Sequence, residues 1–301
     1  MPKPRILCLP GYTQNATIFS GRLGAIRKAL KDTAELIFVD PPHIVEMPTE
    51  SSSDFKDKFD STASAAPTSA ADTPRAWWFA ETAEDGTSDF SRFRGFDVTL
   101  VYLRELMEKH APIQGILGFS QGAASAAILA ALVENPQLDP VFSAPPKDEN
   151  TPWPPKPFDF AILSAGFLPL DPKVKAYFDV KPKTPTLHVL GRADTIVGEG
   201  ESSSYCTHSL VLTFISFQSG QSRSHMRSSM PGSNGTTEGS RLPLFTLTTT
   251  TGHHTPNKAS WRQFFKAYIE AFGDEGKGAE GVVDIPSPMS GPAAVEAGGK
   301  L

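Results

Sequence analysis

The feature of this chain that most constrains its fold is the pentapeptide Gly118-Phe119-Ser120-Gln121-Gly122, which stands between two apolar segments of different length. The short run at 115–117 predicts a buried strand, and the longer run at 123–133 predicts a helix. Glycines flank Ser120, and they permit a turn so sharp that larger side chains would clash there. We therefore expect a strand–turn–helix unit with Ser120 at its tip.

The rest of the chain repeats this alternation of short apolar runs with helix-length patterns. The clearest helix is the last one, because apolar residues between Trp261 and Phe272 recur at the spacing of one helical face. Strands separated by helices indicate βαβ units, so we expect an α/β fold with a mostly parallel central sheet flanked by helices. The further strands are expected at 6–9, 36–39, 160–163 and 187–190, and the further helices at 23–30 and 96–107.

Four segments interrupt this rhythm. Residues 46–74 and 143–157 are rich in Pro and small polar residues, which favours surface excursions, and residues 273–301 are rich in Gly and predict a flexible tail. Residues 202–251 are atypical, because 21 of these 50 residues are Ser or Thr and no helical or strand period persists. Apart from the tail, we expect a single domain over residues 1–272.

The atypical segment 202–251 has a second peculiarity, at the level of its codons. Gly200-Glu201-Ser202 can be encoded by a splice-donor sequence, and Phe217-Gln218 by an acceptor sequence. We hypothesise that part of this stretch is a retained intron or a gene-model artefact. Sequencing the cDNA tests this, and a main transcript that keeps the stretch would refute it.

Charge and cysteine content exclude several classes of protein. The 28 Lys and Arg residues are balanced by 33 Asp and Glu, so the chain lacks the basic surface of a nucleic-acid binder. No apolar run approaches the roughly 20 residues of a membrane helix. The two cysteines, Cys8 and Cys206, imply no disulfide framework. We expect a cytoplasmic protein without nucleic-acid or membrane partners.

A serine hydroxyl becomes a useful nucleophile when an imidazole takes its proton and a carboxylate orients that imidazole. Asp194 follows a predicted strand, and His253 precedes the last helix, so Ser120, Asp194 and His253 occur in the chain order of an α/β-hydrolase triad. The alternatives are a purely structural turn for Ser120 and an exposed loop aspartate for Asp194. We expect a catalytic triad.

The negative oxygen of a tetrahedral intermediate needs two backbone N–H donors. Gln121, directly after Ser120, is the first candidate, and Tyr12 or Thr13, in the loop after the first strand, is the second. A plain tight turn is the alternative interpretation of this loop. The doublet His253-His254 lacks further ligands at metal-binding spacing, so neither a metal nor a cofactor is expected.

Three further residues are candidates for contact with substrate. Trp77 and Trp78, followed by Phe79, could form an apolar lid over an acyl chain, or they could belong to the buried core. His43 follows a predicted strand end and could line the pocket, although a solvated loop histidine is the alternative.

Six segments together resemble the fungal FSH family of α/β-hydrolases, which includes the homologues of ovarian cancer-associated protein 2. They are residues 9–15, 75–78, 115–123, 164–167, 191–194 and 252–256. The resemblance places the family's Ser, Asp and His on Ser120, Asp194 and His253. Three departures are Pro10, where the family usually has His, Thr251, which replaces a Gly before His253, and residues 202–251, which match nothing in the family.

The resemblance implies a serine carboxylesterase or thioesterase that acts on small acyl esters or thioesters through an acyl-enzyme. Several fungal members resemble thioesterases of secondary metabolism that release polyketides from synthase carrier domains, which would make a carrier domain a partner. A general short-chain esterase is the rival activity. A catalytically inactive binding or scaffold protein is the alternative outside enzymes.

Overall fold

A central parallel sheet of six strands organises the computed structural model, which describes residues 2–46, 61–82, 88–194, 196, 244–249, 252–273, 278–282 and 285–289. The strand order is β10-β9-β8-β7-β1-β2, and every neighbouring pair is parallel. The strands are β1 (Arg5–Leu9), β2 (Glu35–Phe38), β7 (Gly115–Phe119), β8 (Phe160–Ser164), β9 (Thr186–Gly191) and β10 (Leu244–Thr249).

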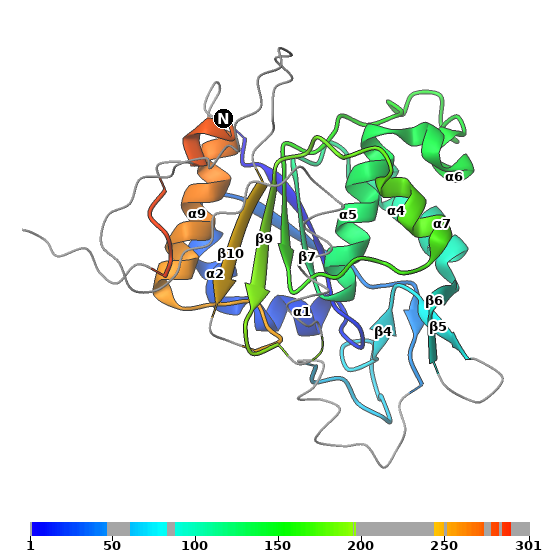
Figure 1. Cartoon of the computed structure of the whole chain (residues 1–301), viewed down its shortest axis with the longest axis horizontal. Helices are drawn as coiled ribbons and strands as arrows, with labels where there is room; N and C mark the ends of the chain where they lie inside the picture. Colours follow the sequence, from blue (N-terminus) through cyan, green and yellow to red (C-terminus); the bar gives the residue numbers. More distant parts are fainter. Residues whose placement is uncertain are drawn as a thin grey trace, which may run out of the picture.

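Helices cover both faces of the sheet (Figure 1). One face carries α1 (Ala16–Arg22), α2 (Gly24–Leu30) and α9 (Ala259–Gly273). The other carries α4 (Phe96–His110), α5 (Gln121–Glu134), α6 (Pro140–Ser143) and α7 (Pro172–Lys175). Three short 3-10 turns complete the helical structure of the described residues: Pro136–Leu138, Ala176–Phe178 and Glu280–Val282. This three-layer arrangement confirms the predicted α/β-hydrolase fold.

Two small antiparallel pairs stand outside the central sheet. They are β3 (His43–Ile44) with β4 (Arg75–Ala76), and β5 (Phe79–Thr82) with β6 (Ser88–Arg94). In Figure 1 these strands lie beyond the start of α5, near the end of the sheet where β7 stops. They therefore lie at the carboxyl edge of the parallel strands.

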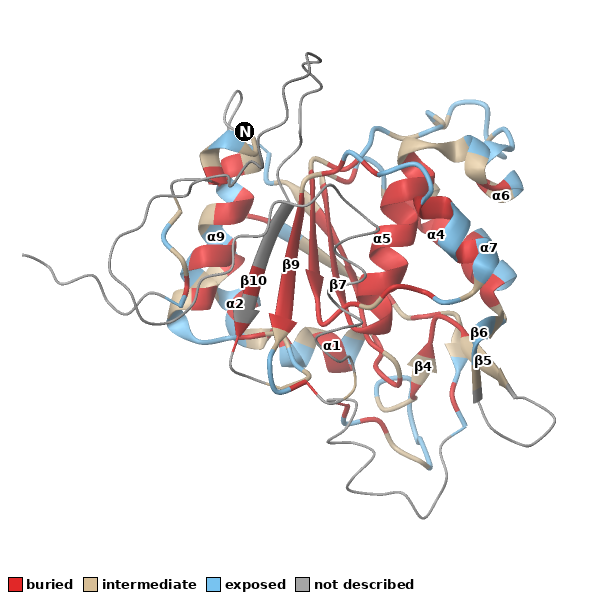
Figure 2. Cartoon of the chain, in the orientation of Figure 1, coloured by how far each residue is buried: buried red, intermediate tan, exposed pale blue. Residues whose placement is uncertain are grey.

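The central strands are buried on both faces, as their apolar composition predicts (Figure 2). In β1, Leu7 and Leu9 belong to the cluster under α4 and α5, whereas Ile6 and Cys8 belong to the cluster under α1, α2 and α9. Helix α5 is buried all round from Gln121 to Val133, because it packs between the sheet and the helices outside it. Burial of Cys8 raises the pKa of its thiol well above its ordinary range.

Two segments contain more order, within the described residues, than the sequence pattern indicates. No strand period persists in the sequence of residues 202–251, yet Leu244–Thr249 form β10 and pair with β9 along their whole length. Leucine and β-branched threonine suit a strand, but the surrounding Ser and Thr obscured the pattern. The tail was expected to be flexible, yet Val282 and Ile285 pack against the core cluster that contains α9. Residues 197–243 lie outside the described residues.

The two excursions are irregular where they are described. Residues 61–74 contain neither helix nor strand, and neither do residues 144–159. The first excursion is nevertheless fixed to the body of the protein, since the Asn15 side-chain amide donates hydrogen bonds to the carbonyls of Ala70, Ala71 and Thr73. Among the described helices, of which the longest have 15 residues, none has the length and hydropathy to traverse a bilayer.

Candidate functional site

Ser120 occupies the turn between β7 and α5, as the sequence predicts. Its backbone has φ 53° and ψ −120°, a conformation that non-glycine residues rarely adopt and that costs free energy. A Cβ added at Gly118 would lie 2.3 Å from the Gly122 carbonyl oxygen, and one added at Gly122 would lie 2.2 Å from the Leu9 carbonyl oxygen. Both glycines are therefore required by close backbone contact, and Ser120 is held rigidly at the carboxyl edge.

Three strands deliver the predicted triad to one place. The hydroxyl oxygen of Ser120 lies 2.9 Å from Nε2 of His253, and Nδ1 of His253 lies 2.8 Å from Oδ2 of Asp194. Asp194 follows β9, and His253 follows β10, which is adjacent to β9 in the sheet. Strand β10 thus leads the chain to His253.

All three side chains of the triad are largely shielded from solvent. The side chains of His253 and Asp194 are 6% and 2% exposed, and Ser120 is 5% exposed. The backbone N–H of Ile196 donates to Oδ1 of Asp194 at 2.9 Å, and the Phe119 ring lies 5.0 Å from the His253 ring. The Nδ1–H of His253 donates a hydrogen bond to Asp194, so the unprotonated Nε2 faces the Ser120 hydroxyl and can accept its proton.

The loop after β1 lies against this turn. A Cβ added at Gly11 would lie 2.8 Å from the Phe119 ring, and the backbone N–H of Gln14 donates to the Gly11 carbonyl at 3.1 Å. Thr13 is fully buried and has φ 66°, again an unusual value for a residue with a side chain. Burial raises the pKa of the neighbouring Tyr12 phenol.

Gln121 opens α5, and the first N–H groups of a helix have no partner within the helix. The structure therefore brings together the two segments that carry the predicted oxyanion donors. Which of Tyr12 and Thr13 supplies the second donor stays a prediction.

The three residues expected to contact substrate are placed differently. Trp77 is 0% exposed and Trp78 is 3% exposed, and both belong to the core beside α4 and α5, so the lid interpretation is wrong for this pair. Trp78 stacks on Phe93 with ring centroids 4.8 Å apart. Two consecutive tryptophans outside any periodic element carry no local indication of burial, which is why the sequence left both interpretations open.

His43 also has a structural role in place of the expected contact with substrate. Its Nε2 forms a hydrogen bond of 2.8 Å with the Gly95 carbonyl oxygen and lies 3.3 Å from the Thr99 hydroxyl. A Cβ added at Gly95 would lie 2.8 Å from the His43 ring. His43 therefore fastens β3 to the start of α4.

Sequence reasoning missed the residues that hold the loop after β1. The Asn15 side chain accepts from the Ile18 N–H at the start of α1 as well as binding the 70–73 backbone, and the Ser61 hydroxyl donates to the Thr13 carbonyl at 3.0 Å. Asn15 before a helix is an ordinary N-cap pattern that the sequence offered. Ser61 lies in a low-complexity excursion and offered none.

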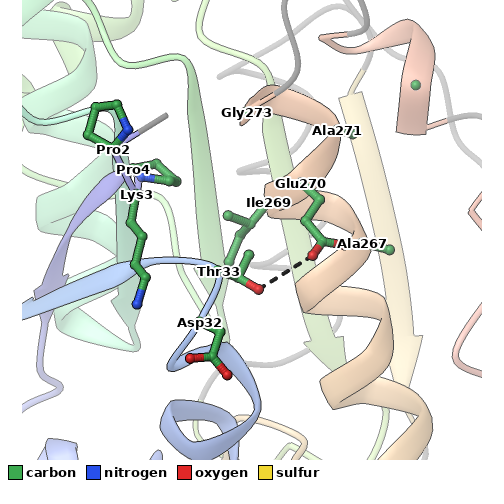
Figure 3. A pocket seen from close by; sticks show the side chains of 11 residues that line it. Pro2, Lys3, Pro4, Asp32, Thr33, Ala267, Ile269, Glu270, Ala271 and Gly273 are labelled. Carbon is green, nitrogen blue, oxygen red and sulfur yellow. Dashed lines mark hydrogen bonds between the residues drawn. The ribbon is translucent and has the colours of Figure 1, made fainter.

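Two cavities lie at opposite ends of the sheet. A small one of about 190 Å³ adjoins Phe119 and the residues after His253. A larger one of about 550 Å³ lies between the residues that precede β1, the turn at Asp32 and Thr33, and the end of α9 (Figure 3). Since Ser120 follows a strand of the same parallel sheet, the larger cavity is remote from it. The described residues contain no group of three or more His, Cys, Asp or Glu side chains arranged to hold a metal.

Comparison with known proteins agrees with this geometry. The profile of the serine hydrolase (FSH1) family matches residues 1–220. The "Esterase OVCA2" of Xenopus tropicalis is 33% identical over 207 residues, which cover 68% of this chain and 79% of that protein. The human "Esterase OVCA2" is 30% identical over 277 residues, covering 90% of this chain and 97% of that protein.

Two further matches come from a plant. The Arabidopsis thaliana "Rhodanese-like domain-containing protein 6" is 35% identical over 198 residues, which cover 63% of this chain and 30% of that protein. A solved structure of Arabidopsis SOBER1 L63A covers 91% of this chain and all of that chain with a TM-score of 0.49 and 13% identity, a likeness too distant to bear on function. The sequence relatives include animal, plant and fission-yeast proteins, so the likeness is not confined to fungi. The chain belongs to the serine hydrolase (FSH1) family.

Proposed function

We propose that this protein hydrolyses carboxylic ester or thioester bonds of small acyl substrates through a covalent intermediate on Ser120. The observation that carries the proposal is the continuous hydrogen-bonded chain from the Ser120 hydroxyl through His253 to Asp194, with distances of 2.9 and 2.8 Å. Membership of a serine hydrolase family supports the same assignment.

In the first half-reaction, the Ser120 oxygen attacks the substrate carbonyl carbon while Nε2 of His253 takes the serine proton. Asp194 stabilises the imidazolium that forms. The negative oxygen of the tetrahedral intermediate accepts hydrogen bonds from the Gln121 N–H and from the N–H of Tyr12 or Thr13. When the intermediate collapses, the bond to the alcohol or thiol breaks, and the leaving group takes the proton from His253.

In the second half-reaction, water replaces the departed group. His253 takes a proton from this water as its oxygen attacks the acyl carbon of the ester on Ser120. Collapse then releases the carboxylic acid and returns the proton to Ser120. The triad requires neither metal nor organic cofactor for these steps.

The proposal also includes a narrower class of substrate. We favour acyl thioesters, including polyketide chains carried on a synthase domain in fungal secondary metabolism. The support is that the six sequence segments resemble the fungal FSH family, several members of which resemble such thioesterases. A general short-chain esterase is the rival. A cytoplasmic setting, without nucleic-acid or membrane partners, completes the proposal.

Hydrolysis assays separate these activities. The wild type should hydrolyse p-nitrophenyl esters or acyl thioesters, and Ser120→Ala should lose this hydrolysis while remaining folded by circular dichroism. The kcat/KM for acyl thioesters compared with p-nitrophenyl esters of varied chain length decides between the two substrate classes. If a folded wild type hydrolyses neither class, the enzyme proposal is wrong and the inactive binding protein is the better interpretation.

A further inference from the structure

The buried indole of Trp77 lies between the two segments that carry the oxyanion donors. Its Nε1 donates a hydrogen bond of 2.8 Å to the carbonyl oxygen of Pro10, the first residue after β1. Trp77 is 0% exposed, so water does not compete for this bond. The Pro10 carbonyl also lies against the first turn of α5, since a Cβ added at Gly122 would come within 2.3 Å of it.

The side chain of Gln121 holds the backbone of the tryptophan pair. The Trp77 N–H donates to Oε1 of Gln121 at 2.9 Å, and Nε2 of Gln121 donates to the Trp78 carbonyl at 2.9 Å. The oxygen and the nitrogen of the Gln121 amide therefore both make hydrogen bonds to this backbone. The Thr99 hydroxyl of α4 donates to the Trp77 carbonyl, so the N–H, the carbonyl and the indole of Trp77 are all bonded.

These bonds form one connection from the turn at Ser120 to the loop after β1. Gln121, which follows Ser120, binds Trp77, and Trp77 binds Pro10, which precedes Gly11, Tyr12 and Thr13. At its other end, the same loop is fixed by the Ser61 hydroxyl on the Thr13 carbonyl. Trp77 thus anchors the end of the loop nearest β1.

We propose that Trp77, held by the side chain of Gln121, is a positioning residue that sets the distance between the two oxyanion donors. The inference rests on the proposed hydrolase activity. Oxyanion donors act only when they point to the place that the negative oxygen will occupy, and small displacements are costly. Without the indole N–H, the Pro10 carbonyl would be buried without its donor, and the loop would shift to regain one.

The test compares two tryptophans that make the same kind of bond. Trp77→Phe removes the indole donor but keeps an aromatic ring. Trp153→Phe is the matched control, because Nε1 of Trp153 also donates to a backbone carbonyl, that of Phe142, at 2.7 Å in the distant 144–159 loop. Gln121→Met is a second variant that removes the clasp on Trp77 but keeps the backbone N–H of residue 121.

Each variant is assayed for kcat and KM on a p-nitrophenyl ester and for the inhibition constant of a trifluoromethyl ketone, which forms a tetrahedral adduct with the serine. Trp77→Phe should lower kcat by about 10- to 100-fold with KM within about twofold, and should weaken the ketone by a similar factor, because the defect lies in transition-state stabilisation. Gln121→Met should move both quantities in the same direction. Trp153→Phe should leave both unchanged.

Two failures are distinguishable. If an active wild type and Trp77→Phe have the same kcat and the same ketone affinity, the positioning role is refuted while the hydrolase assignment stands. If Trp77→Phe does not fold, a Gln121→Met variant with unaltered kcat refutes the role as well. If the folded wild type has no hydrolase activity and no affinity for the ketone, the proposed function fails, and the inference fails with it.

Discussion

The two ends of the central sheet differ in backbone conformation and in the size of the adjacent cavity. All three non-glycine residues with positive φ among the described residues, Thr13, Ser120 and Ala165, follow strands at the carboxyl edge. The larger cavity, of about 550 Å³, lies at the amino edge beside Thr33, and none of its lining residues is among these three. The residues with unusual backbone conformations and the larger cavity therefore lie at opposite ends of the sheet.

Cavity size is therefore a poor guide to the position of the triad in this molecule. At the carboxyl edge, unusual backbone conformations persist because surrounding bonds fix them, as the bond from the Ser120 N–H to the Ser164 carbonyl at 2.9 Å illustrates. At the amino edge, the Thr33 hydroxyl makes one long hydrogen bond of 3.4 Å with Glu270 (Figure 3). The triad lies at the carboxyl edge, where the unusual backbone conformations are fixed by hydrogen bonds.

The largest effect is expected from Asp194→Asn at the carboxyl edge. The amide can donate to Nδ1 of His253 and so favour the wrong tautomer, which should lower kcat by about 10³- to 10⁴-fold. Steady-state hydrolysis of a p-nitrophenyl ester measures this loss. Asp32→Asn, at an exposed position beside the amino-edge cavity, is the control and should retain full kcat. If both variants had the same kcat, the claim that only the carboxyl edge is catalytic would be wrong.

A second large effect is expected from Gly122→Ala. The added Cβ would lie 2.2 and 2.3 Å from two backbone oxygens, those of Leu9 and Pro10, so β1 and α5 must separate. We expect a loss of about 3 kcal/mol in the free energy of unfolding and of about 10²-fold in kcat. Urea unfolding and ester hydrolysis measure the two quantities.

Gly21→Ala in α1 is the control for that substitution, because an added Cβ there meets nothing within 4 Å. It should raise the free energy of unfolding by up to about 1 kcal/mol, since alanine favours a helix more than glycine. If both alanine variants behaved alike, the close contact of α5 with β1 would not be what requires glycine.

A smaller effect concerns His188, in β9 between the two edges. Burial lowers the pKa of His188 to about 3 from its ordinary value of 6.5, so the folded protein keeps it neutral. The unfolded chain binds a proton there below about pH 6.5, and the folded chain does not, so stability should fall as the pH drops from 6.5 toward 3. His188→Leu should reduce this slope in urea unfolding measured between pH 5 and 8, and an unchanged slope would contradict the assignment.

The smallest effect is expected from Thr33→Val at the amino edge. Loss of a long, partly exposed hydrogen bond should change the free energy of unfolding by at most about 0.5 kcal/mol. The kcat for ester hydrolysis should remain that of the wild type. A loss of kcat would show that the amino-edge cavity takes part in function.

Local pattern was sufficient for much of the fold and for the triad. The glycines around Ser120, the strand before Asp194 and the apolar face of the last helix are all encoded within a few residues of one another. Chain order then related Ser120, Asp194 and His253 without any knowledge of distances. The structure brings the three side chains together at 2.8 and 2.9 Å.

Long-range contacts account for what sequence reasoning missed. The burial of Trp77 depends on Gln121 and Pro10, which are 44 and 67 residues away in the chain. The strand β10 depends on its pairing with β9, and the order around Val282 depends on its packing against the cluster that contains α9. None of these partners is visible in a local window. The sequence therefore left lid and core open for the tryptophans, and it indicated an irregular segment and a flexible tail.

The most direct test of the account is to find where a fluorophosphonate probe attaches to the full chain. We expect one adduct per molecule, located on Ser120 by peptide mass spectrometry. Ser120→Ala should take no probe, and Asp194→Asn should be labelled more slowly than the wild type. A folded wild type that takes no probe, or one that carries it on a different residue, would contradict the claim that the strained carboxyl edge is the catalytic site.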